Sequence, residues 1–311
     1  MIFNECQDLW SYLQSQKEKS IVMYGMGNGA DKILSVCERY GIEIADFFAS
    51  DGFVRGHSFH GKVVLSYSDT KAKYGAENMI VLISFGSSLP DVTARFYDMA
   101  DTCELYAPDV PVCGGELFDA DFYLKNSESF ERARGLFADE KSKEVFDDLV
   151  SYKLSGDIRY LRHADTEKDD ALREILSGGY TAYADLGAYN GDTIDEFLSY
   201  SGGTYRKIIA LEPNAKNFAK LRAHCEGMER VELWQLGAWK ENAVLTFNNK
   251  AGRNSAIADS GVQTRVAAVD SLLCGTKAGY VKADVEGADR EALLGMEKTL
   301  RLFAPKLNLA A

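Results

Sequence analysis

The stretch GGYTAYADLGAYNGDTIDEFLSY, residues 178–200, decides the fold of the C-terminal part of the chain. Its apolar run ends in Asp185-Leu186-Gly187, which predicts a buried strand that stops at a glycine turn. Asp192 then stands where an N-cap residue would open a helix, and Ile194 and Phe197 share one face of that helix. The pattern therefore predicts a strand, a tight loop and a helix, which is the beginning of an α/β domain.

The loop between this strand and helix has the chemistry of a ligand site. The pattern D-x-G-x-x-x-G puts Gly187 and Gly191 where a side chain would block the approach of a ligand. The first N–H groups of the helix have no partner inside it, so they favour a carboxylate or a phosphate. The next apolar run, KIIALEP at 207–213, ends in Glu212, where nucleoside-binding sheets place the acid that holds ribose hydroxyls. Both segments predict a small, partly anionic ligand.

Four segments in this order resemble the FkbM-type family of S-adenosylmethionine-dependent methyltransferases. They are DLGAYNGDT at 185–193, ALEPN at 210–214, LGAW at 236–239 and KADVEGADREALLG at 282–295, of which the last resembles the family's strand-four signature. The resemblance covers roughly residues 152–311, and it implies a class I methyltransferase fold with S-adenosyl-L-methionine as cofactor. Tyr189 stands where the commoner methyltransferase loop has its middle glycine.

The resemblance also implies roles for individual residues at the cofactor. The loop from Gly187 to Gly191 passes under the methionine part, Asp185 and Asp192 orient polar groups, and Glu212 binds the ribose hydroxyls. Ala238 and Trp239 flank the adenine. The full implied set of cofactor-binding residues is Asp185, Gly187, Ala188, Tyr189, Asn190, Gly191, Asp192, Glu212, Asn214, Ala238, Trp239 and Ser255, with Asn254 as a neighbour of the last. For Asn254 and Ser255 the alternative is a plain surface loop.

Two carboxylates, Asp284 and Glu286, follow the predicted fourth strand, and the resemblance implies that they face the transfer site. One of them is a candidate general base that removes the proton of an acceptor hydroxyl. The alternative is structural, because residues two apart on a strand share a face and can form a hydrogen-bonded cluster that fixes the loop. The implied reaction is O-methylation of a small hydroxylated acceptor, such as a sugar or a sugar-containing metabolite.

The N-terminal stretch SIVMYGMGNGADKIL repeats the strand, loop and helix pattern, with Gly25, Gly27 and Gly29 in the loop. A further strand leads to Asp51, which follows the glycine loop at the sequence distance where dinucleotide-binding domains have an acid that contacts the ribose. The pattern therefore predicts a Rossmann-like unit on a parallel sheet. Residues 20–111 resemble the small Rossmann-like domain of bacterial sugar acyltransferases, which implies a nucleotide-sugar site at these four residues. The alternative is a domain that only packs, docks or dimerises.

The predicted organisation has three parts. A Rossmann-like domain spans 1–115, a helical connector or lid spans 116–177, where apolar residues recur at helical spacing, and the methyltransferase domain spans 178–311. VELWQLGAW is expected to form the third strand of the last domain, AVLTFNN and VQTRVAAVD an antiparallel pair, and the helix from Asp289 to bury Leu293, Leu294 and Leu300. KLNLAA reads as the start of a fifth strand, and the resemblance implies later strands. The fold class is therefore α/β, two Rossmann-like domains with parallel-rich sheets, the second without its last strands.

The composition points to a small-molecule partner. A net charge of -12 and a pI near 4.9 argue against binding to nucleic acid or to an anionic membrane. The first residues contain no uninterrupted apolar stretch, so we expect a cytoplasmic protein; a homodimer stays open. The six cysteines form no C-x-x-C pair and predict reduced core thiols, and His57 and His60 lie in a glycine-containing loop, so no metal site is expected.

Two other functions compete with methyl transfer. The sequence YGMGNGA fits the dinucleotide fingerprint better than DLGAYNG does, which favours an NAD-dependent sugar-nucleotide oxidoreductase. The third candidate is a non-catalytic binding or scaffold protein in glycan assembly. A preference for NAD over S-adenosylmethionine distinguishes the first of these from the methyltransferase.

Overall fold

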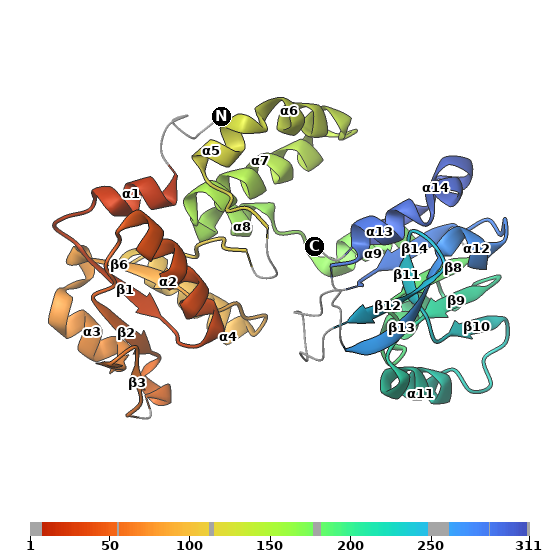
Figure 1. Cartoon of the computed structure of the whole chain (residues 1–311), viewed down its shortest axis with the longest axis horizontal. Coiled ribbons are helices and arrows are strands. Elements are labelled where there is room, and N and C mark those ends of the chain that lie inside the picture. Colours follow the sequence, from red (N-terminus) through yellow and green to blue (C-terminus); the bar gives the residue numbers. More distant parts are fainter. Residues whose placement is uncertain are drawn as a thin grey trace. The chain divides into compact units, whose positions relative to one another are not determined.

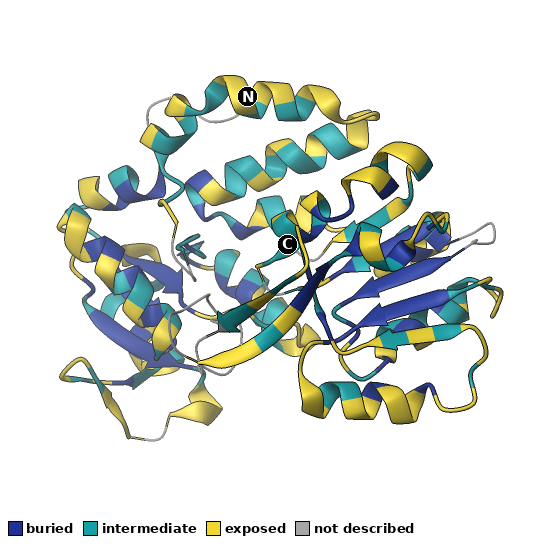
Figure 2. Ribbon diagram, turned by 45° about the vertical axis from the view of Figure 1, so that its right-hand side comes forward, coloured by how far each residue is buried: buried dark blue, intermediate teal, exposed yellow. Residues whose placement is uncertain are grey.

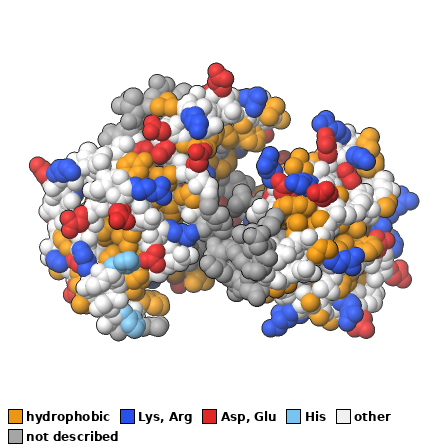
Figure 3. All heavy atoms as spheres, in the orientation of Figure 1, with side chains coloured by type: hydrophobic (Ala, Val, Ile, Leu, Met, Phe, Trp, Pro, Cys, Tyr) orange, Lys and Arg blue, Asp and Glu red, His pale blue; other side chains and the backbone are white. Residues whose placement is uncertain are grey.

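The computed structural model describes residues 8–54, 56–111, 115–176, 182–247, 261–285 and 287–309. The chain divides into two compact units, residues 1–165 and residues 166–311 (Figure 1). Each unit contains its own five-stranded sheet and its own core. On the face seen in Figure 3, basic and acidic side chains intermingle on each unit.

The sheet of the first unit is parallel throughout, with the order β5-β2-β1-β6-β7. Its strands are β1 (Ser20–Tyr24), β2 (Asp46–Ala49), β5 (Leu65–Ser66), β6 (Met79–Ile83) and β7 (Glu104–Tyr106). The helices between them are α2 (Asn28–Tyr40), α3 (Tyr67–Tyr74) and α4 (Pro90–Ala100), and β3 (Ser58–Phe59) with β4 (Lys62–Val63) forms a small hairpin. From the central strand β1 the chain adds β2 and β5 on one side, and it then adds β6 and β7 on the other side. This is the arrangement of a Rossmann-like sheet, and it confirms the predicted Rossmann-like unit on a parallel sheet.

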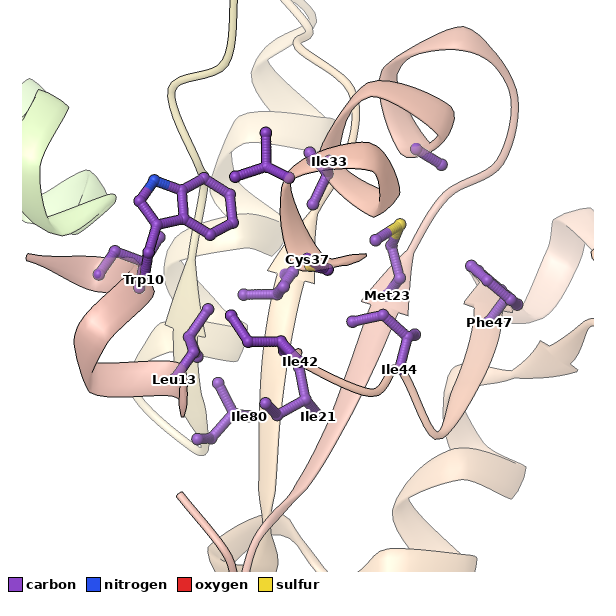
Figure 4. Close-up of a cluster of buried hydrophobic side chains, with 14 of the residues drawn as sticks. Trp10, Leu13, Ile21, Met23, Ile33, Cys37, Ile42, Ile44, Phe47 and Ile80 are labelled. Carbon is purple, nitrogen blue, oxygen red and sulfur yellow. The ribbon is translucent and has the colours of Figure 1, made fainter. Parts of the chain in front are cut away.

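The core of this unit follows from the alternation of side chains along β1. Ile21 and Met23 point to the face covered by α2 and by α1 (Leu9–Ser15), where Trp10 and Leu13 pack as their spacing predicts (Figure 4). Val22 and Tyr24 point to the opposite face, in the cluster that contains Phe96 of α4. Because both faces are covered, the strands read as continuous apolar runs, and Figure 2 shows them as buried.

The segment predicted as a helical connector is helical. Its helices are α5 (Ala120–Lys125), α6 (Ser127–Leu136), α7 (Glu140–Ser155), α8 (Ile158–Ala164) and α9 (Lys168–Leu176). The first four belong to the first unit and α9 to the second. The Ala107 N–H donates to Gly156 O at 2.7 Å, and Ile158 joins the core of the first unit. Not every residue of the recurring apolar pattern is buried, because Phe137 lies beyond the end of α6 and is exposed, as is Leu149 on α7.

The main sheet of the second unit has the corresponding order, β10-β9-β8-β14-β15, and all its pairs are parallel. Its strands are β8 (Tyr183–Leu186), β9 (Ile208–Leu211), β10 (Val231–Trp234), β14 (Tyr280–Ala283) and β15 (Lys306–Leu309). Its helices are α10 (Asp192–Tyr200), α11 (Ala215–His224), α12 (Val269–Leu273), α13 (Asp289–Leu294) and α14 (Glu297–Phe303). The predicted strand in KLNLAA is confirmed as β15.

The prediction that VELWQLGAW is one strand is wrong. The Leu236 N–H donates to Trp234 O at 2.9 Å, and this tight turn ends β10. The residues after the turn form β11 (Gly237–Trp239), which pairs with β13 (Val262–Ala268) in a separate three-stranded sheet. β13 also pairs with β12 (Ala243–Phe247), and this confirms the predicted antiparallel pair.

The prediction of one helix from Asp289 is also wrong, because α13 ends at Leu294 and α14 begins at Glu297. A Cβ on Gly295 would lie 1.9 Å from Trp239 O, so the chain between the two helices packs directly on β11. Leu293 and Leu300 pack against the core as expected, whereas Leu294 is exposed.

The thiols of Cys37, Cys103 and Cys225 are free and buried, as predicted for core cysteines. Cys274 is free but exposed, because it follows the end of α12. Cys6 and Cys113 lie outside the described residues. Within the described ranges, no helix is both long and apolar enough to cross a membrane.

Candidate active site

The predicted site residues converge at the carboxyl ends of three neighbouring strands of the second unit. Asp185 lies on β8, Glu212 directly follows β9, and Asp284 directly follows β14. β8 is central, and the connections on its two sides run in opposite directions, so these ends form the topological switch point where open α/β sheets bind ligands. Three aromatic rings stack on one another near the beginning of β8 and β14, those of Tyr183, Phe197 and Tyr280. The ring centroids of Tyr183 and Phe197 are 4.4 Å apart.

Gly187 is required by packing. Its φ is +88°, and a Cβ there would lie 2.0 Å from the main-chain oxygen of Asp284. At Gly191 a Cβ would lie 2.6 Å from the His224 ring. Close packing against Asp284 and His224 of the chain itself therefore accounts for both glycines, and the approach of a ligand to them stays a prediction.

Tyr189 adopts the backbone conformation that a glycine would supply at the middle of the loop. Its φ is +47°, which costs a non-glycine residue about 1–2 kcal/mol. Its ring is exposed and lies under the Lys220 ammonium, which is 5.8 Å from the ring centroid. The preceding residue, Ala188, is buried, and its N–H donates to Leu211 O at 2.9 Å. Tyr189 thus adopts a left-handed backbone conformation at the position where the commoner loop has a glycine.

Glu212 joins this loop to the next helix. Only 6% of the residue is exposed, and its Oε2 accepts from the Tyr189 N–H at 3.0 Å while Oε1 accepts from the Asn214 N–H at 2.8 Å. Burial raises the pKa of the Glu212 carboxyl, and the two backbone donors act in the opposite direction. Asn214 caps α11, because its Oδ1 accepts from the N–H groups of Lys216 and Asn217.

The start of α10 differs from the prediction by one residue. Gly191 is the N-cap and Asp192 is the first helical residue. The Thr193 N–H donates to Asp192 Oδ1 at 2.9 Å, and the Asp192 N–H donates to Asn190 Oδ1 at 3.3 Å. The first two N–H groups of the helix are therefore not unpaired as expected, and an anionic ligand would have to displace these side chains.

Asp185 is wholly buried and only half satisfied. Its Oδ2 accepts from the Thr193 hydroxyl at 2.5 Å, whereas its Oδ1 finds no hydrogen-bond partner among the described residues. Burial raises the pKa of this carboxyl, and the Lys282 ammonium and the hydroxyls of Thr193 and Tyr183 act against that rise. A buried acceptor without a donor costs free energy, so this oxygen would gain from a donor that a ligand brings once it displaces the groups that cover the oxygen.

Lys282 is a site residue that the sequence analysis did not single out. Its Nζ donates to Gly187 O at 3.0 Å and lies 3.7 Å from Asp185 Oδ1 and 3.9 Å from Asp284 Oδ2. The signal was present in the strand KAD, because a lysine two residues before Asp284 faces the same side of the sheet.

The other predicted residues are only partly brought together. The Asp284 side chain is 52% exposed, and its N–H donates to Leu186 O at 2.9 Å. Ala238 packs in the core of the second unit, and Trp239 is half-buried with the Lys240 ammonium 5.8 Å from its ring centroid. Glu286, Asn254 and Ser255 lie outside the described residues.

In the first unit, the three glycines have different surroundings. A Cβ on Gly25 would lie 2.5 Å from Ser84 Oγ and one on Gly29 2.0 Å from Ser84 O, whereas nothing lies within 4 Å at Gly27. Asp51 is exposed and accepts from the Ser68 N–H at 3.0 Å and from the Ser68 hydroxyl at 2.6 Å. These bonds lower the pKa of Asp51.

A cavity of about 530 Å³ adjoins Asp51. Arg95 stands in its wall, and its Nη1 donates to Ser50 Oγ at 2.8 Å. The other lining residues include Phe53, Tyr67 and Lys71.

Among the comparisons with known proteins, a family model matches most of the second unit. Residues 185–309 match the model of the Methyltransferase FkbM domain family. The chain is similar in structure to the methyltransferase FkbM from Methylobacillus flagellatus KT, with a TM-score of 0.66 and 15% identity over 95% of this chain and 80% of that chain; at this identity the likeness shows the fold alone. An rRNA methylase from Streptococcus thermophilus matches with a TM-score of only 0.27 and 19% identity, over 42% of this chain and 60% of that one. No curated protein sequence matches the chain significantly.

Proposed function

We propose that residues 185–309, which match the FkbM methyltransferase domain model, form a domain that binds S-adenosyl-L-methionine and methylates a hydroxyl group of a small acceptor. The observation that carries the proposal is the buried Asp185 Oδ1, which has no donor among the described residues and lies beside the glycine loop at the switch point of the sheet. The cofactor supplies a methyl group on a positively charged sulfur, together with amino and ribose hydroxyl donors. A site with Asp185, Glu212 and Asp284 suits such a ligand in charge and in hydrogen bonding.

Asp185 and Glu212 are proposed as the two acceptors for the cofactor. Asp185 Oδ1 would accept from the amino group. A carboxylate offers about four acceptor sites, of which the backbone N–H groups of Tyr189 and Asn214 occupy two at Glu212. The remaining sites would accept from the ribose hydroxyls, and the two backbone bonds keep the carboxylate oriented for that role.

The test of cofactor binding is calorimetric titration of the chain with S-adenosylhomocysteine, and with NAD in parallel. The proposal predicts a dissociation constant on the order of micromolar for S-adenosylhomocysteine. Tighter binding of NAD would instead favour the oxidoreductase. If neither ligand binds, the methyltransferase proposal is wrong for this chain.

Asp284 is proposed as the general base that takes the proton of the acceptor hydroxyl. It directly follows β14, and its half-exposed side chain is accessible to an acceptor. We expect Asp284→Asn to lower turnover by about 10²- to 10⁴-fold, because an amide cannot take the proton, and to leave the affinity for S-adenosylhomocysteine within about threefold. The measurement is release of S-adenosylhomocysteine with an acceptor that the wild type methylates. Unchanged turnover would leave Asp284 with a structural role only.

For the acceptor, we propose a sugar or a sugar-containing metabolite. The resemblance to the FkbM-type family supports this acceptor class. The Asp284 carboxylate supports it as well, because a carboxylate can take the proton of a sugar hydroxyl. A screen of free and nucleotide-linked sugars against simple polyols, with wild type and Asp284→Asn side by side, distinguishes real turnover from background release.

A second function is proposed for the first unit, namely binding of a nucleotide in the cavity beside Asp51. The observation that favours it is the set of groups in one cavity: aromatic rings of Phe53 and Tyr67, the carboxylate of Asp51, and the guanidinium of Arg95. These suit a base, ribose hydroxyls and a phosphate respectively. At Gly27 no other atom lies within 4 Å of the position of a Cβ. This glycine is in the loop that follows β1, and β1 pairs with β2, the strand that precedes Asp51.

We expect Arg95→Ala to weaken binding of uridine or adenosine diphosphate by at least about tenfold, since a charge-assisted bond to phosphate is lost. Arg39→Ala is the matched control, because Arg39 lines a different cavity of the same unit. Titration of both variants decides the question: equal affinities in wild type and Arg95→Ala would exclude this cavity as the phosphate site.

A further inference from the structure

Lys282 occupies a position that a lysine rarely takes. It lies on β14, which has β8 on one side and β15 on the other, and only 13% of its side chain is exposed. Its neighbours along the strand, Val281 and Ala283, are buried in the core. An ammonium group is tolerated in such a place only when its charge is paired and its donors are used.

The partners of Lys282 all belong to the candidate site. In the parallel register of β14 and β8, Lys282 is directly opposite Asp185, so the two side chains share a face. The Lys282 Nζ donates to the main-chain oxygen of Gly187 and lies within 4 Å of the carboxylates of Asp185 and Asp284. The Lys282 ammonium therefore lies next to the glycine loop and to the carboxyl ends of β8 and β14.

The bond to Gly187 fixes the loop from the side opposite β9. The N–H groups of Gly187 and Ala188 both donate to Leu211 O at 2.9 Å. The carbonyl of Gly187 is held by Lys282, so the peptide at the start of the loop is anchored in both directions. The peptide between Gly187 and Ala188, which leads the chain to Tyr189, is thus held by hydrogen bonds at both its C=O and its N–H.

The distance to Asp185 is the second informative feature. At 3.7 Å the ammonium attracts the charge of Asp185 Oδ1 without forming a hydrogen bond to it. No group of the described residues donates a hydrogen bond to that oxygen, and the ammonium reduces the cost of its buried negative charge.

We propose that Lys282 is a positioning residue of the site, which anchors the glycine loop through Gly187 and keeps the Asp185 carboxylate charged for the ligand. This inference rests on the proposed cofactor site, and it assigns Lys282 no contact with the reacting atoms.

The inference predicts a pH dependence. The titratable groups that interact with Asp185 are Lys282 on β14, Tyr183 on β8, Asp192 at the start of α10 and Cys225 after α11. The carboxylates of Glu212 and Asp284 interact with the same Lys282 ammonium. Burial already raises the pKa of Asp185, and the Lys282 ammonium lowers it. Without the ammonium the carboxyl takes up a proton at higher pH, so ligand affinity is lost at a pH where the wild type still binds.

The experiment is titration of S-adenosylhomocysteine into wild type, Lys282→Met and Lys282→Arg, over roughly pH 6 to 9. We expect Lys282→Met to bind at least about tenfold more weakly near neutral pH, with a loss that grows as the pH falls. Lys282→Arg keeps the charge and should bind within about fivefold of the wild type. Lys207→Met is the matched control, because it removes a lysine paired with Glu232 at 2.9 Å just before β9, at the amino ends of the strands.

The outcomes separate this inference from the proposed function. If the wild type does not bind S-adenosylhomocysteine, the proposed function fails. If the wild type binds and Lys282→Met matches it at every pH, the role of Lys282 is overturned.

A double-mutant cycle with Asp185→Asn covers the case in which Lys282→Met alone does not fold, because removing both charges leaves no unbalanced charge at the buried position 185. In the Asp185→Asn background, Lys282→Met should cost less affinity than the tenfold expected in the wild type. A loss of tenfold or more in that background would contradict action through Asp185.

Discussion

Replacing Gly187 with alanine is expected to lower the free energy of unfolding of the second unit by about 2–5 kcal/mol. Two costs add up: a left-handed conformation at an L-residue, and a Cβ that would lie 2.0 Å from Asp284 O. Because the chain after β14 must move to make room, we also expect binding of S-adenosylhomocysteine to be lost. Urea unfolding followed by tryptophan fluorescence measures the effect, since Trp234 and Trp239 lie in this unit and Trp10 in the other.

Gly202→Ala separates the two costs. Gly202 has a φ of +62°, and nothing lies within 4 Å of the Cβ it would gain. This variant should therefore show only the backbone cost, about 1–2 kcal/mol, and bind the ligand normally. Equal destabilisation of the two variants would contradict the close packing of the loop against Asp284.

Replacing Glu212 with alanine is expected to weaken binding of S-adenosylhomocysteine by about 1–3 kcal/mol, which is roughly 5- to 150-fold. The variant loses the proposed acceptor of the ribose hydroxyls, and it also leaves the N–H groups of Tyr189 and Asn214 without their carboxylate. Calorimetry gives the affinity, and thermal unfolding reports the second effect.

Glu232→Ala is the control for loss of a glutamate from this sheet, because Glu232 lies exposed on β10 and pairs with Lys207. It should leave the affinity unchanged. An affinity of Glu212→Ala within twofold of the wild type would remove Glu212 from the ribose assignment, whatever its effect on stability.

The sequence predicted the parts of the fold that depend on local pattern. The apolar runs at 21–24 and 183–186, each followed by glycines, were recognisable because a buried parallel strand and its turn are encoded in consecutive residues. The acids at the ends of the second strands, Asp51 and Glu212, were recognisable from their place after those runs. Glu212 joins the site in the second unit, and Asp51 adjoins a cavity in the first.

What the sequence did not predict depends on contacts between distant segments. Gly187 is constrained by the main chain at Asp284, and the chain between α13 and α14 is constrained by Trp239 O. The turn between β10 and β11 falls within LWQL, residues 233–236, which contains no glycine or proline that would predict a turn. One backbone hydrogen bond, from the Leu236 N–H to Trp234 O, stabilises it. A lysine in a strand is usually a surface residue, so the burial of Lys282 could not be predicted from KAD, although its place two residues before Asp284 indicated a shared face; its register opposite Asp185 brings it into the site.

The most direct test of the central claim is hydrogen–deuterium exchange of the full chain with and without S-adenosylhomocysteine. A cofactor site at the switch point of the second sheet predicts slower exchange in peptides that cover 185–193, 210–214 and 280–285, and unchanged exchange at 21–30 in the first unit. Protection at 21–30 with no change in the three peptides of the second unit would contradict the account.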